Sequence, residues 1–504
     1  MWTQVSQWKW SILLIVCSFP LAQLSAVDQA QWGQRYTRNM VSSEKDLPSS
    51  FDLDSGKNIK WIISLGSESW ATPVVAQGRV FQGTNNDPPR DPRIKGDRGV
   101  MLCLDEKDGS LLWQLIVPKL GPDPYWDWPS GGIVSPPSVE GDRVYVVSNR
   151  GEVMCLDIQG QLNGNQGPFL DEARLMTSEG EGLLSVTNLD ADILWLFDIP
   201  KQAGIYPHDA AHSSILIDGD FLYVNTSNGV DNTHRRIRAP QAPSLIVLDK
   251  QTGRYLACDH EGIGPRIFHC TWSSPALGAV NGQKQIFFGG GDGIVYAFKA
   301  LKSRPPVGRI ESLEKIWSFD CDPTAPKQNV HLYTKNRDEG PSNIKGMPVF
   351  YNNRIYVAAG GDIWWGKRQA WLKCIDATGQ GDVTGSAEKW SYTLNGHCSA
   401  TPSIYNGLVF ISDCAKTIHC IDAETGVAYW THRVKGDMWG STLVADGKVY
   451  VGTRRREFII LSATKEKKVL DNVRLDTAMA ASPCVANGVL YVTSMKKLYA
   501  IQRQ

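Results

Sequence analysis

The sequence predicts an all-β fold, an eight-bladed β-propeller closed by an N-terminal strand. A hairpin pattern recurs eight times along the 504 residues, a pattern that ends in Trp follows most copies, and no stretch shows helical periodicity of useful length. Units of four strands repeated eight times are typical of a propeller, in which each blade is one four-stranded sheet. Two separate four-unit domains are the alternative, which is disfavoured because no linker-like composition lies near the middle of the chain.

The first 26 residues have the pattern of a secretory signal peptide. Lys9 is their only charged residue, residues 11–22 are apolar, and Ser25 and Ala26 are small residues before Val27. The apolar stretch is shorter than the ~20 residues that a membrane-spanning helix needs. We therefore expect cleavage near Ala26, a periplasmic or secreted mature protein, and no transmembrane span in the mature chain.

The mature chain is predicted to consist of an N-terminal extension, residues 27–58, and one propeller, residues 59–504. Each hairpin places alternating apolar residues on both sides of a Gly or Asn turn. The copies cover residues 71–81, 135–145, 213–224, 274–288, 347–357, 400–411, 441–451 and 482–492. The last unit has only three strands, and the strand at residues 59–65 has no hairpin partner. We therefore expect residues 59–65 to complete the last blade and so remove a sheet edge.

The second pattern is Leu or Ile followed by Asp, then Gly, then Trp, and it is clearest at residues 104–113 and 421–430. The Gly permits a turn conformation that a Cβ opposes. The aromatic ring can cover the flat face of a neighbouring sheet. Six tryptophans fall at fourth-strand positions and are predicted to be structural: Trp61, Trp113, Trp195, Trp317, Trp390 and Trp430.

The Asp-x-x-Thr/Asp-Gly-x-x-x-Trp phrases at residues 105–113 and 422–430 resemble the tryptophan-docking motif of the pyrroloquinoline quinone (PQQ) repeat family. The resemblance covers nearly all of the mature chain and implies the eight-bladed fold. It implies two kinds of activity. The family includes quinoprotein alcohol dehydrogenases, and it includes the propeller lipoprotein of the outer-membrane barrel-assembly machinery, a scaffold that binds no cofactor.

The charge balance argues against nucleic acid as a partner. Lys and Arg number 52 and Asp and Glu number 52, so the formal net charge is zero, whereas nucleic-acid binders carry a basic excess. Apolar residues make up 42% of the chain, which places it among globular proteins.

The cysteines are consistent with an exported protein. Cys258 with Cys270 and Cys398 with Cys414 are candidate disulfide pairs, because the first two bracket one loop and the second two flank one hairpin. The sequence has no Cys-x-x-Cys pair for zinc or haem. It also has no adjacent Cys-Cys pair, and many quinoprotein alcohol dehydrogenases carry one, so this absence counts against PQQ chemistry.

A ligand or partner site is expected on one face of the ring. The loops that lead into the innermost strands and the loops between second and third strands lie there, around the central channel. Three of the latter are long, at residues 84–99, 227–243 and 360–369, and long loops on one rim indicate binding. Their aromatic side chains can stack on a planar ring or sugar, and Arg can grip carboxylates. The candidate ligand-binding residues are Trp70, Arg93, Trp126, Trp128, His208, Arg235, Trp272, Trp364, Arg368, His397 and Trp439.

The resemblance implies PQQ and calcium as cofactors if the chain is a dehydrogenase. Calcium takes oxygen ligands, for which Asn228, Asp231 and Asp292 are candidates. Asp231 or Asp362 is then the candidate base. The tryptophans before the innermost strands can instead plug the channel.

Histidine is a second candidate ligand type. His208 and His212 are the pair closest to metal-binding spacing. The dipeptides at His269, His397 and His419, each followed by Cys, are not expected to bind a metal together, because neighbouring strand residues point to opposite faces.

The sequence favours a binding or scaffold module of the cell envelope, whose ligand or partner, an envelope protein or a small molecule, docks at the loop-rich face. The first alternative is a PQQ- and calcium-dependent alcohol or polyol dehydrogenase, and the second is a carbohydrate-binding propeller. A long insertion at residues 159–190 joins the third and fourth strands of the second blade. We expect it to project from the opposite face as a lid or a partner-contact arm.

Overall fold

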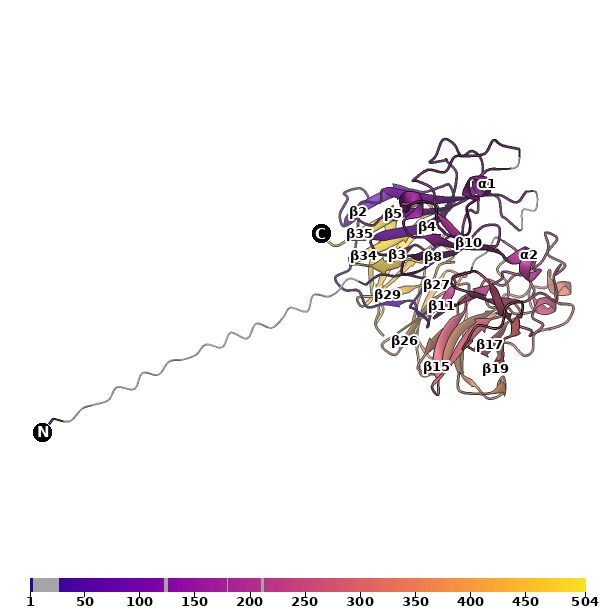
Figure 1. The fold of residues 1–504 in the computed structure, drawn as a ribbon. Coiled ribbons are helices and arrows are strands. Elements are labelled where there is room, and N and C mark those ends of the chain that lie inside the picture. The colour runs from indigo at the N-terminus through magenta and orange to yellow at the C-terminus, as the bar shows by residue number, and fades with distance from the viewer. Residues whose placement is uncertain (3–26, 122–125, 179, 210–212) are drawn as a thin grey trace.

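The fold is the predicted eight-bladed propeller. The computed structural model describes residues 1–2, 27–121, 126–178, 180–209 and 213–504, so nearly all of the predicted signal peptide lies outside the described residues. Eight separate sheets, each with four antiparallel strands at its centre, follow one another along the chain. They are arranged around a common axis (Figure 1).

The strands of each blade are given from the innermost outward. The first four blades are β3 (Val74–Ala76), β4 (Arg79–Asn85), β5 (Arg98–Asp105) and β6 (Leu111–Pro118); β7 (Ser138–Glu140), β8 (Arg143–Val147), β9 (Glu152–Asp157) and β10 (Ile193–Asp198); β11 (Leu216–Asp218), β12 (Phe221–Asn225), β13 (Leu245–Asp249) and β14 (Tyr255–Cys258); and β15 (Ala276–Val280), β16 (Gln283–Gly289), β17 (Ile294–Lys299) and β19 (Lys315–Asp320). The last four are β20 (Val349–Tyr351), β21 (Arg354–Gly360), β22 (Ala370–Asp376) and β24 (Glu388–Leu394); β25 (Ser403–Tyr405), β26 (Leu408–Ser412), β27 (Thr417–Asp422) and β28 (Ala428–Arg433); β29 (Leu443–Ala445), β30 (Lys448–Gly452), β31 (Glu457–Ser462) and β32 (Val469–Arg474); and β33 (Cys484–Ala486), β34 (Val489–Thr493), β35 (Lys497–Gln502) and β2 (Ile59–Ser64).

Short elements complete the description. The two-residue strands β1 (Val41–Ser42), β18 (Glu311–Ser312) and β23 (Gly381–Asp382) extend the sheets of the seventh, third and fourth blades. The helical segments are α1 (Glu172–Met176), α2 (Ile199–Ala203), and the 3-10 turns η1 (Gly160–Asn163), η2 (Gly264–Arg266) and η3 (Val330–Tyr333). No helix in the described part of the chain is both long and apolar enough to cross a membrane.

The N-terminal strand closes the ring, as the sequence predicts. β2 pairs antiparallel with β35, so the last blade combines strands from both ends of the chain (Figure 1). The predicted span, residues 59–65, differs from the observed strand by one residue. Because every blade then has two neighbours, no blade is left with an open face, and the ring is tied together by this one pairing.

The fourth-strand tryptophans join neighbouring blades. The indole Nε1 of Trp113 donates a hydrogen bond to the Ile158 carbonyl of the next blade (3.0 Å), and Trp390 donates to the Ala423 carbonyl in the same way (3.0 Å). The Trp390 ring also lies against Gly426, where a Cβ would come within 2.7 Å of it. Gly426 has a φ of 73°, so this turn needs Gly for its backbone as well as for the space. The repeated Gly and Trp are therefore two halves of one contact between successive blades.

The extension at residues 27–58 runs across the ends of the innermost strands, on the side away from the long loops. The carbonyls of Ala30, Tyr36, Thr37 and Met40 accept hydrogen bonds from the innermost strands of the second, fourth, fifth and seventh blades. The remaining four blades are contacted by Gln29, Arg38, Asn39 and Val27, which bond to Val75, Ser214, Ile404 and Asn487. One segment therefore touches all eight blades and closes this mouth of the channel.

Arg38 anchors the extension. Its side chain is completely buried and donates hydrogen bonds to the carbonyls of Trp32 (3.0 Å), Ser214 (2.8 Å) and Pro275 (2.9 Å). Burial lowers the pKa of this guanidinium to about 9. No carboxylate of the described residues forms a salt bridge with it, so main-chain carbonyls and the Ser214 hydroxyl (3.2 Å) stabilise the buried charge.

The insertion at residues 159–190 leaves the second blade between β9 and β10, where it was expected, but it does not project from the opposite face. Asp190 pairs with Gln114 of the outer strand β6. Arg93, in the β4–β5 loop, donates to the Asp190 carboxylate (3.1 Å), and Arg98 lies 3.4 Å from the Glu181 carboxylate. The insertion therefore follows the outside of the first blade up to the loop-rich face, and we call it the arm.

The two predicted disulfides do not form. Cys258, Cys270, Cys398 and Cys414 are all free thiols. The thiols of Cys398 and Cys414 instead donate to the main-chain carbonyls of Ser412 and Met438, so each sulfur already has a local partner.

Candidate functional site

The loops before the innermost strands and the loops between second and third strands meet around the second mouth of the channel, opposite the extension. Four predicted tryptophans lie in contact there. Trp70 packs on Trp439 (ring centroids 5.6 Å apart), Trp439 on Trp364 (5.4 Å), and Trp364 on Trp272 (6.1 Å). The Arg454 guanidinium lies over both Trp70 and Trp439, at 5.0 and 4.8 Å. Of the two alternatives for these rings, an open funnel or a plug of the channel, their mutual contacts favour the plug.

The space left on the axis is small. A cavity of about 80 Å³ remains between Trp70, Trp272 and Trp439 on one side and Trp32 of the extension on the other. Pockets that hold small organic ligands usually measure about 300–1,000 Å³. The tricyclic PQQ does not fit among these side chains, so the residues present do not match the cofactor that the resemblance implies.

Beside the tryptophans lies a buried chain of ionisable groups. The Asp362 carboxylate accepts a hydrogen bond from His269 Nδ1 (2.9 Å) and lies 2.7 Å from the Lys345 ammonium. Burial would raise the pKa of Asp362, but the charges of Lys345 and His269 hold it well below its usual range. The Lys345 ammonium also lies 3.9 Å from the centre of the Trp272 ring. This network connects the loops that precede the fourth and fifth blades.

His397 borders the same network. Its Nδ1 bonds to the Gly361 carbonyl, and its Nε2 has no hydrogen-bond partner among the described residues. Burial, followed by the charge of Lys345, lowers the pKa of His397 to about 4, so its imidazole is neutral at physiological pH.

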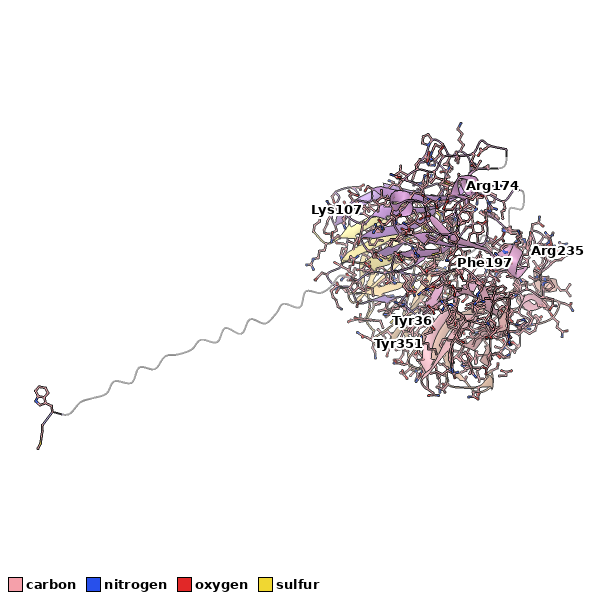
Figure 2. The ribbon with its side chains drawn as sticks, in the orientation of Figure 1. Tyr36, Lys107, Arg174, Phe197, Arg235 and Tyr351 are labelled. Atoms are coloured by element: carbon pink, nitrogen blue, oxygen red, sulfur yellow. The ribbon has the colours of Figure 1, made fainter. Side chains whose placement is uncertain are left out.

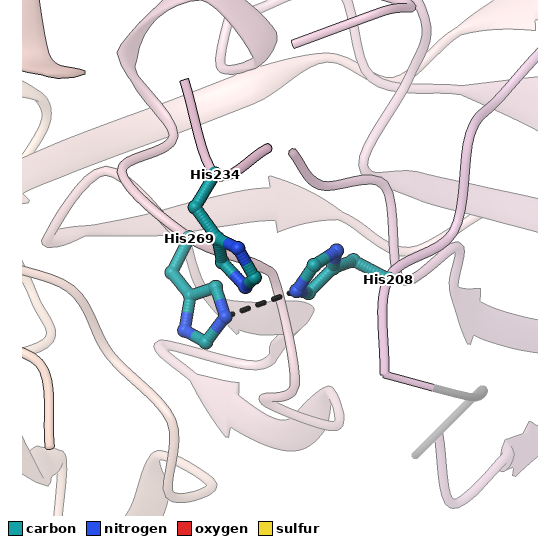
Figure 3. Close-up of side chains that lie close together, drawn as sticks. All are labelled: His208, His234 and His269. Carbon is teal, nitrogen blue, oxygen red and sulfur yellow. Dashed lines mark hydrogen bonds between the residues drawn. The ribbon is translucent and has the colours of Figure 1, made fainter. Parts of the chain in front are cut away.

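Three imidazoles converge next to this network (Figure 3). The Nε2 atoms of His208 and His269 are 3.0 Å apart, and one ring nitrogen from each of His208, His234 and His269 lies within 4.8 Å of the other two. His208 precedes the third blade, His234 lies in the β12–β13 loop, and His269 precedes the fourth blade. Asp209 places one carboxylate oxygen 3.5 Å from His208 Nε2 and the other 3.5 Å from His269 Nε2.

The three imidazole rings differ in charge, because their surroundings shift their pKa values in different directions. Burial lowers the pKa of His208 well below its usual value and that of His234 to about 4, so both are neutral at pH 7. Burial also opposes a charge on His269, but Cys270 and Asp362 outweigh it and raise the pKa of His269 to about 10. A charged His269 donates through Nδ1 to Asp362 and through Nε2 to His208.

The other predicted ligand-binding residues do not join this group. Arg93 pairs with Asp91 and Asp190 at the outside of the first blade, while Arg235 and Arg368 are exposed, with Arg235 at the periphery of the molecule (Figure 2). Trp126 packs edge-on against Tyr206 (5.2 Å), and Trp128 is 42% exposed. These two tryptophans lie on the loop-rich face away from the axis.

The oxygen ligands predicted for calcium are separated and have other partners. Asn228 accepts from the Tyr206 main-chain N–H, Asp231 accepts from Thr233 in its own turn, and Asp292 pairs with Arg266 (2.8 Å). Asn228 and Asp231 share the β12–β13 loop, whereas Asp292 follows β16, and each of the three side chains is engaged with a different partner. Of the two candidate bases, only Asp362 lies in the buried network.

The sequence reasoning did not single out His234, His269, Lys345 or Asp209 as site residues. The sequence argues against His269 and Cys270 as a metal-binding pair, because alternating residues of a strand face opposite ways. That argument does not apply, since both residues precede β15 and lie in a loop. One oxygen of Asp209, a nitrogen of His269 and the Cys270 sulfur lie within 4.8 Å of one another. His212, the other half of the predicted pair, lies outside the described residues.

Comparison with known proteins identifies the family. The family model for the outer membrane protein assembly factor BamB matches residues 49–230 and 415–504, which is more than half of the chain. The chain belongs to this family. The two matched ranges leave out residues 231–414, which contain His234, His269, Lys345 and Asp362. No curated protein matches the sequence.

Solved structures show the same fold at low sequence identity. BamB from Moraxella catarrhalis is 13% identical, with a TM-score of 0.50 over 88% of this chain and 96% of that one. The quinohemoprotein alcohol dehydrogenases from Comamonas testosteroni and from Pseudomonas putida HK5 (ADHIIG) are also 13% identical, with TM-scores of 0.57 and 0.58 over 94% of this chain and 80% of theirs. This BamB-family chain thus shares its fold with BamB and with quinohemoprotein alcohol dehydrogenases.

Proposed function

We propose that this BamB-family chain is exported and acts as a binding or scaffold module of the cell envelope, and that its partner is a protein that docks on the loop-rich face. The observation that carries the proposal is a groove of about 340 Å³ with a mixed apolar and charged lining, which lies on the loop-rich face beside the second blade. The cavity between the tryptophans on the axis measures about 80 Å³.

The groove has the composition of a protein-binding surface. Its apolar lining comes from Leu120, Trp126, Pro200 and Ile205, and its charged lining comes from Arg150, Glu152, Asp198 and Lys201. Protein interfaces combine an apolar, often aromatic centre with a polar rim. Trp128 adds exposed aromatic surface nearby in the chain, with 42% of its area accessible.

The arm adds further exposed apolar side chains beside the first blade, with which it pairs through Asp190 and Gln114. Four of its leucines are more than half exposed: Leu162, Leu170, Leu183 and Leu189. Exposed leucines on a loop that is already held in place by Arg93 and Arg98 favour a contact with a further protein over solvent. This agrees with the interpretation of the arm as a partner-contact element.

A site-specific photo-crosslinking experiment tests the proposal. A photoreactive residue is placed at Leu120 or Trp128 on the loop-rich face, and at Val307 as the control. Val307 is 90% exposed in the β17–β18 connection on the opposite face. We expect a discrete crosslinked protein in envelope fractions of the source organism from the first two positions and none from Val307. Equal crosslinking at Val307, or none at the loop-rich face, contradicts the proposal.

The enzymatic and carbohydrate alternatives are tested on the same purified chain. Addition of PQQ and calcium, followed by dye reduction with a panel of alcohols, is expected to give no turnover, since the tryptophans occupy the axial space. A glycan array is expected to give no specific signal. Turnover in the first assay would replace the scaffold proposal with the dehydrogenase, and specific glycan binding would replace it with the carbohydrate-binding module.

A further inference from the structure

The cluster of His208, His234 and His269 has a property that partner binding at the groove does not require. Its nitrogens come from three separate loops of two blades, and His208 and His269 are buried, with 0% and 2% of their surface exposed. Bringing three basic rings together away from water is unfavourable unless something compensates for it. Among the described residues, a main-chain carbonyl and a carboxylate accept hydrogen bonds from the Nδ1 atoms of His208 and His269.

Each buried imidazole is oriented by its Nδ1. His208 Nδ1 donates to the Val230 carbonyl (2.8 Å), and His269 Nδ1 donates to the Asp362 carboxylate (2.9 Å). Metal-binding histidines characteristically donate one ring N–H to a carbonyl or carboxylate, which fixes the tautomer and aims the other nitrogen at the ion. The two Nε2 atoms face each other across 3.0 Å (Figure 3).

Three of the separations are close to those around a four-coordinate ion. A tetrahedral ion with metal–nitrogen bonds of about 2.0–2.1 Å keeps its ligand atoms about 3.3 Å apart. The two Nε2 atoms are 3.0 Å apart, and each lies 3.5 Å from a different oxygen of Asp209. One ring nitrogen of His234 lies within 4.8 Å of a ring nitrogen of each of the other two histidines. Side-chain adjustments of Asp209 and of the half-buried His234 are needed to complete a tetrahedral shell.

We infer that His208, His234 and His269 bind a divalent transition-metal ion of the zinc type, with the Asp209 carboxylate as the fourth ligand. Imidazole nitrogen with one carboxylate suits Zn²⁺ and related ions, whereas calcium and magnesium prefer all-oxygen sites. An ion at this point takes the place of the proton that His269 donates to His208. The half-buried His234 and Asp209 form the side of the site that solvent can reach.

Two of the four proposed ligands lie outside the part of the chain that the BamB family model matches. His234 and His269 fall in residues 231–414, which the BamB family model does not match. The site is also distinct from the proposed partner groove, since none of its four residues lines that groove. Failure of the metal proposal therefore leaves the scaffold proposal unaffected, and the reverse also holds.

Metal titration of the purified mature chain tests the inference. After treatment with a chelator, the protein is titrated with Zn²⁺ against a competing colorimetric chelator, and bound metal is counted by mass spectrometry. We expect one tightly bound Zn²⁺ per chain, and Co²⁺ at the same site should give the visible absorption of a four-coordinate centre. A stoichiometry of zero in the wild-type protein overturns the inference.

Four variants localise the ion. His234→Ala changes the half-buried ligand and is the variant least able to disturb folding, and His208→Ala and His269→Ala remove the buried ligands; each is expected to abolish tight binding. Asp209→Asn is expected to weaken it about 10-fold or more. His432→Ala, on the outer strand β28, is the matched control and should bind like the wild type. Wild-type affinity in a folded His234→Ala protein, with the cobalt spectrum unchanged, contradicts the proposed ligand set.

Discussion

The two mouths of the propeller channel are closed in different ways. At one mouth, the main chain of residues 27–40 bonds to the innermost strands and covers the axis with ordinary peptide groups. At the other mouth, tryptophan rings and a buried network of Lys345, Asp362 and His269 occupy the corresponding space.

The extension closes its mouth of the channel as a structural element, whereas the other mouth holds the kind of buried ionisable groups that are common at functional sites. The main-chain hydrogen bonds of the extension continue the hydrogen bonding of the innermost strands. Most positions of the extension therefore need no particular side chain. Buried ionisable groups, in contrast, are stable only when their partners are in place, and such clusters are most common at functional sites. The three predictions below test this contrast.

The largest effect is expected for Asp362→Asn. The substitution leaves the buried Lys345 ammonium without its carboxylate, and losing one partner of a buried pair typically reduces the free energy of unfolding by about 3–5 kcal/mol. Urea denaturation followed by tryptophan fluorescence measures the change. The double variant Asp362→Asn/Lys345→Met should be less destabilised than the single variant, because it removes both charges. A double variant that is no more stable than Asp362→Asn would show that the pair does not carry the effect.

Arg38→Ala should have the next largest effect, because Arg38 is a fully buried charged side chain of the extension. The substitution leaves the carbonyls of Trp32, Ser214 and Pro275 without a donor in a buried site, so we expect a loss of about 2–4 kcal/mol in unfolding free energy. Arg235→Ala, at the exposed periphery, is the control and should leave the denaturation midpoint unchanged. If the two variants unfold at the same urea concentration, the anchoring role of Arg38 is wrong.

The smallest effects are expected for two neighbouring residues of the extension. Asn39 imitates a peptide group, since its side chain donates to the Ile404 carbonyl (2.9 Å) and accepts from the Ile404 N–H (2.8 Å). Asn39→Ala should therefore reduce the unfolding free energy by about 2 kcal/mol. Thr37 bonds to Phe350 only through its carbonyl, so Thr37→Ala should change it by less than about 0.5 kcal/mol. A larger effect of Thr37→Ala would show that side chains, not the main chain, close this mouth.

Much of the fold follows from local patterns that a reader of the sequence can recognise. The hairpins, the closing strand at residues 59–65 and the six inter-blade tryptophans depend on spacings within one repeat, and the family resemblance depends on the same residues. The extension at residues 27–58 is predicted as a segment, but its path over the innermost strands is not, because most of those hydrogen bonds use main-chain groups that leave no trace in residue type. The arm was located between the correct strands, but its direction depends on Arg93 and Arg98 in another blade.

The sequence by itself determined the eight repeats, the order of the blades and the face on which the long loops lie, because each of these depends on contacts between residues close in the chain. Only the tertiary structure decided that the tryptophans fill the axis and that His208 and His269, 61 positions apart, bring their Nε2 atoms to 3.0 Å. The angle between successive blades sets which loop tips meet at the centre of the ring. That angle comes from the packing of whole sheets, which no single repeat encodes.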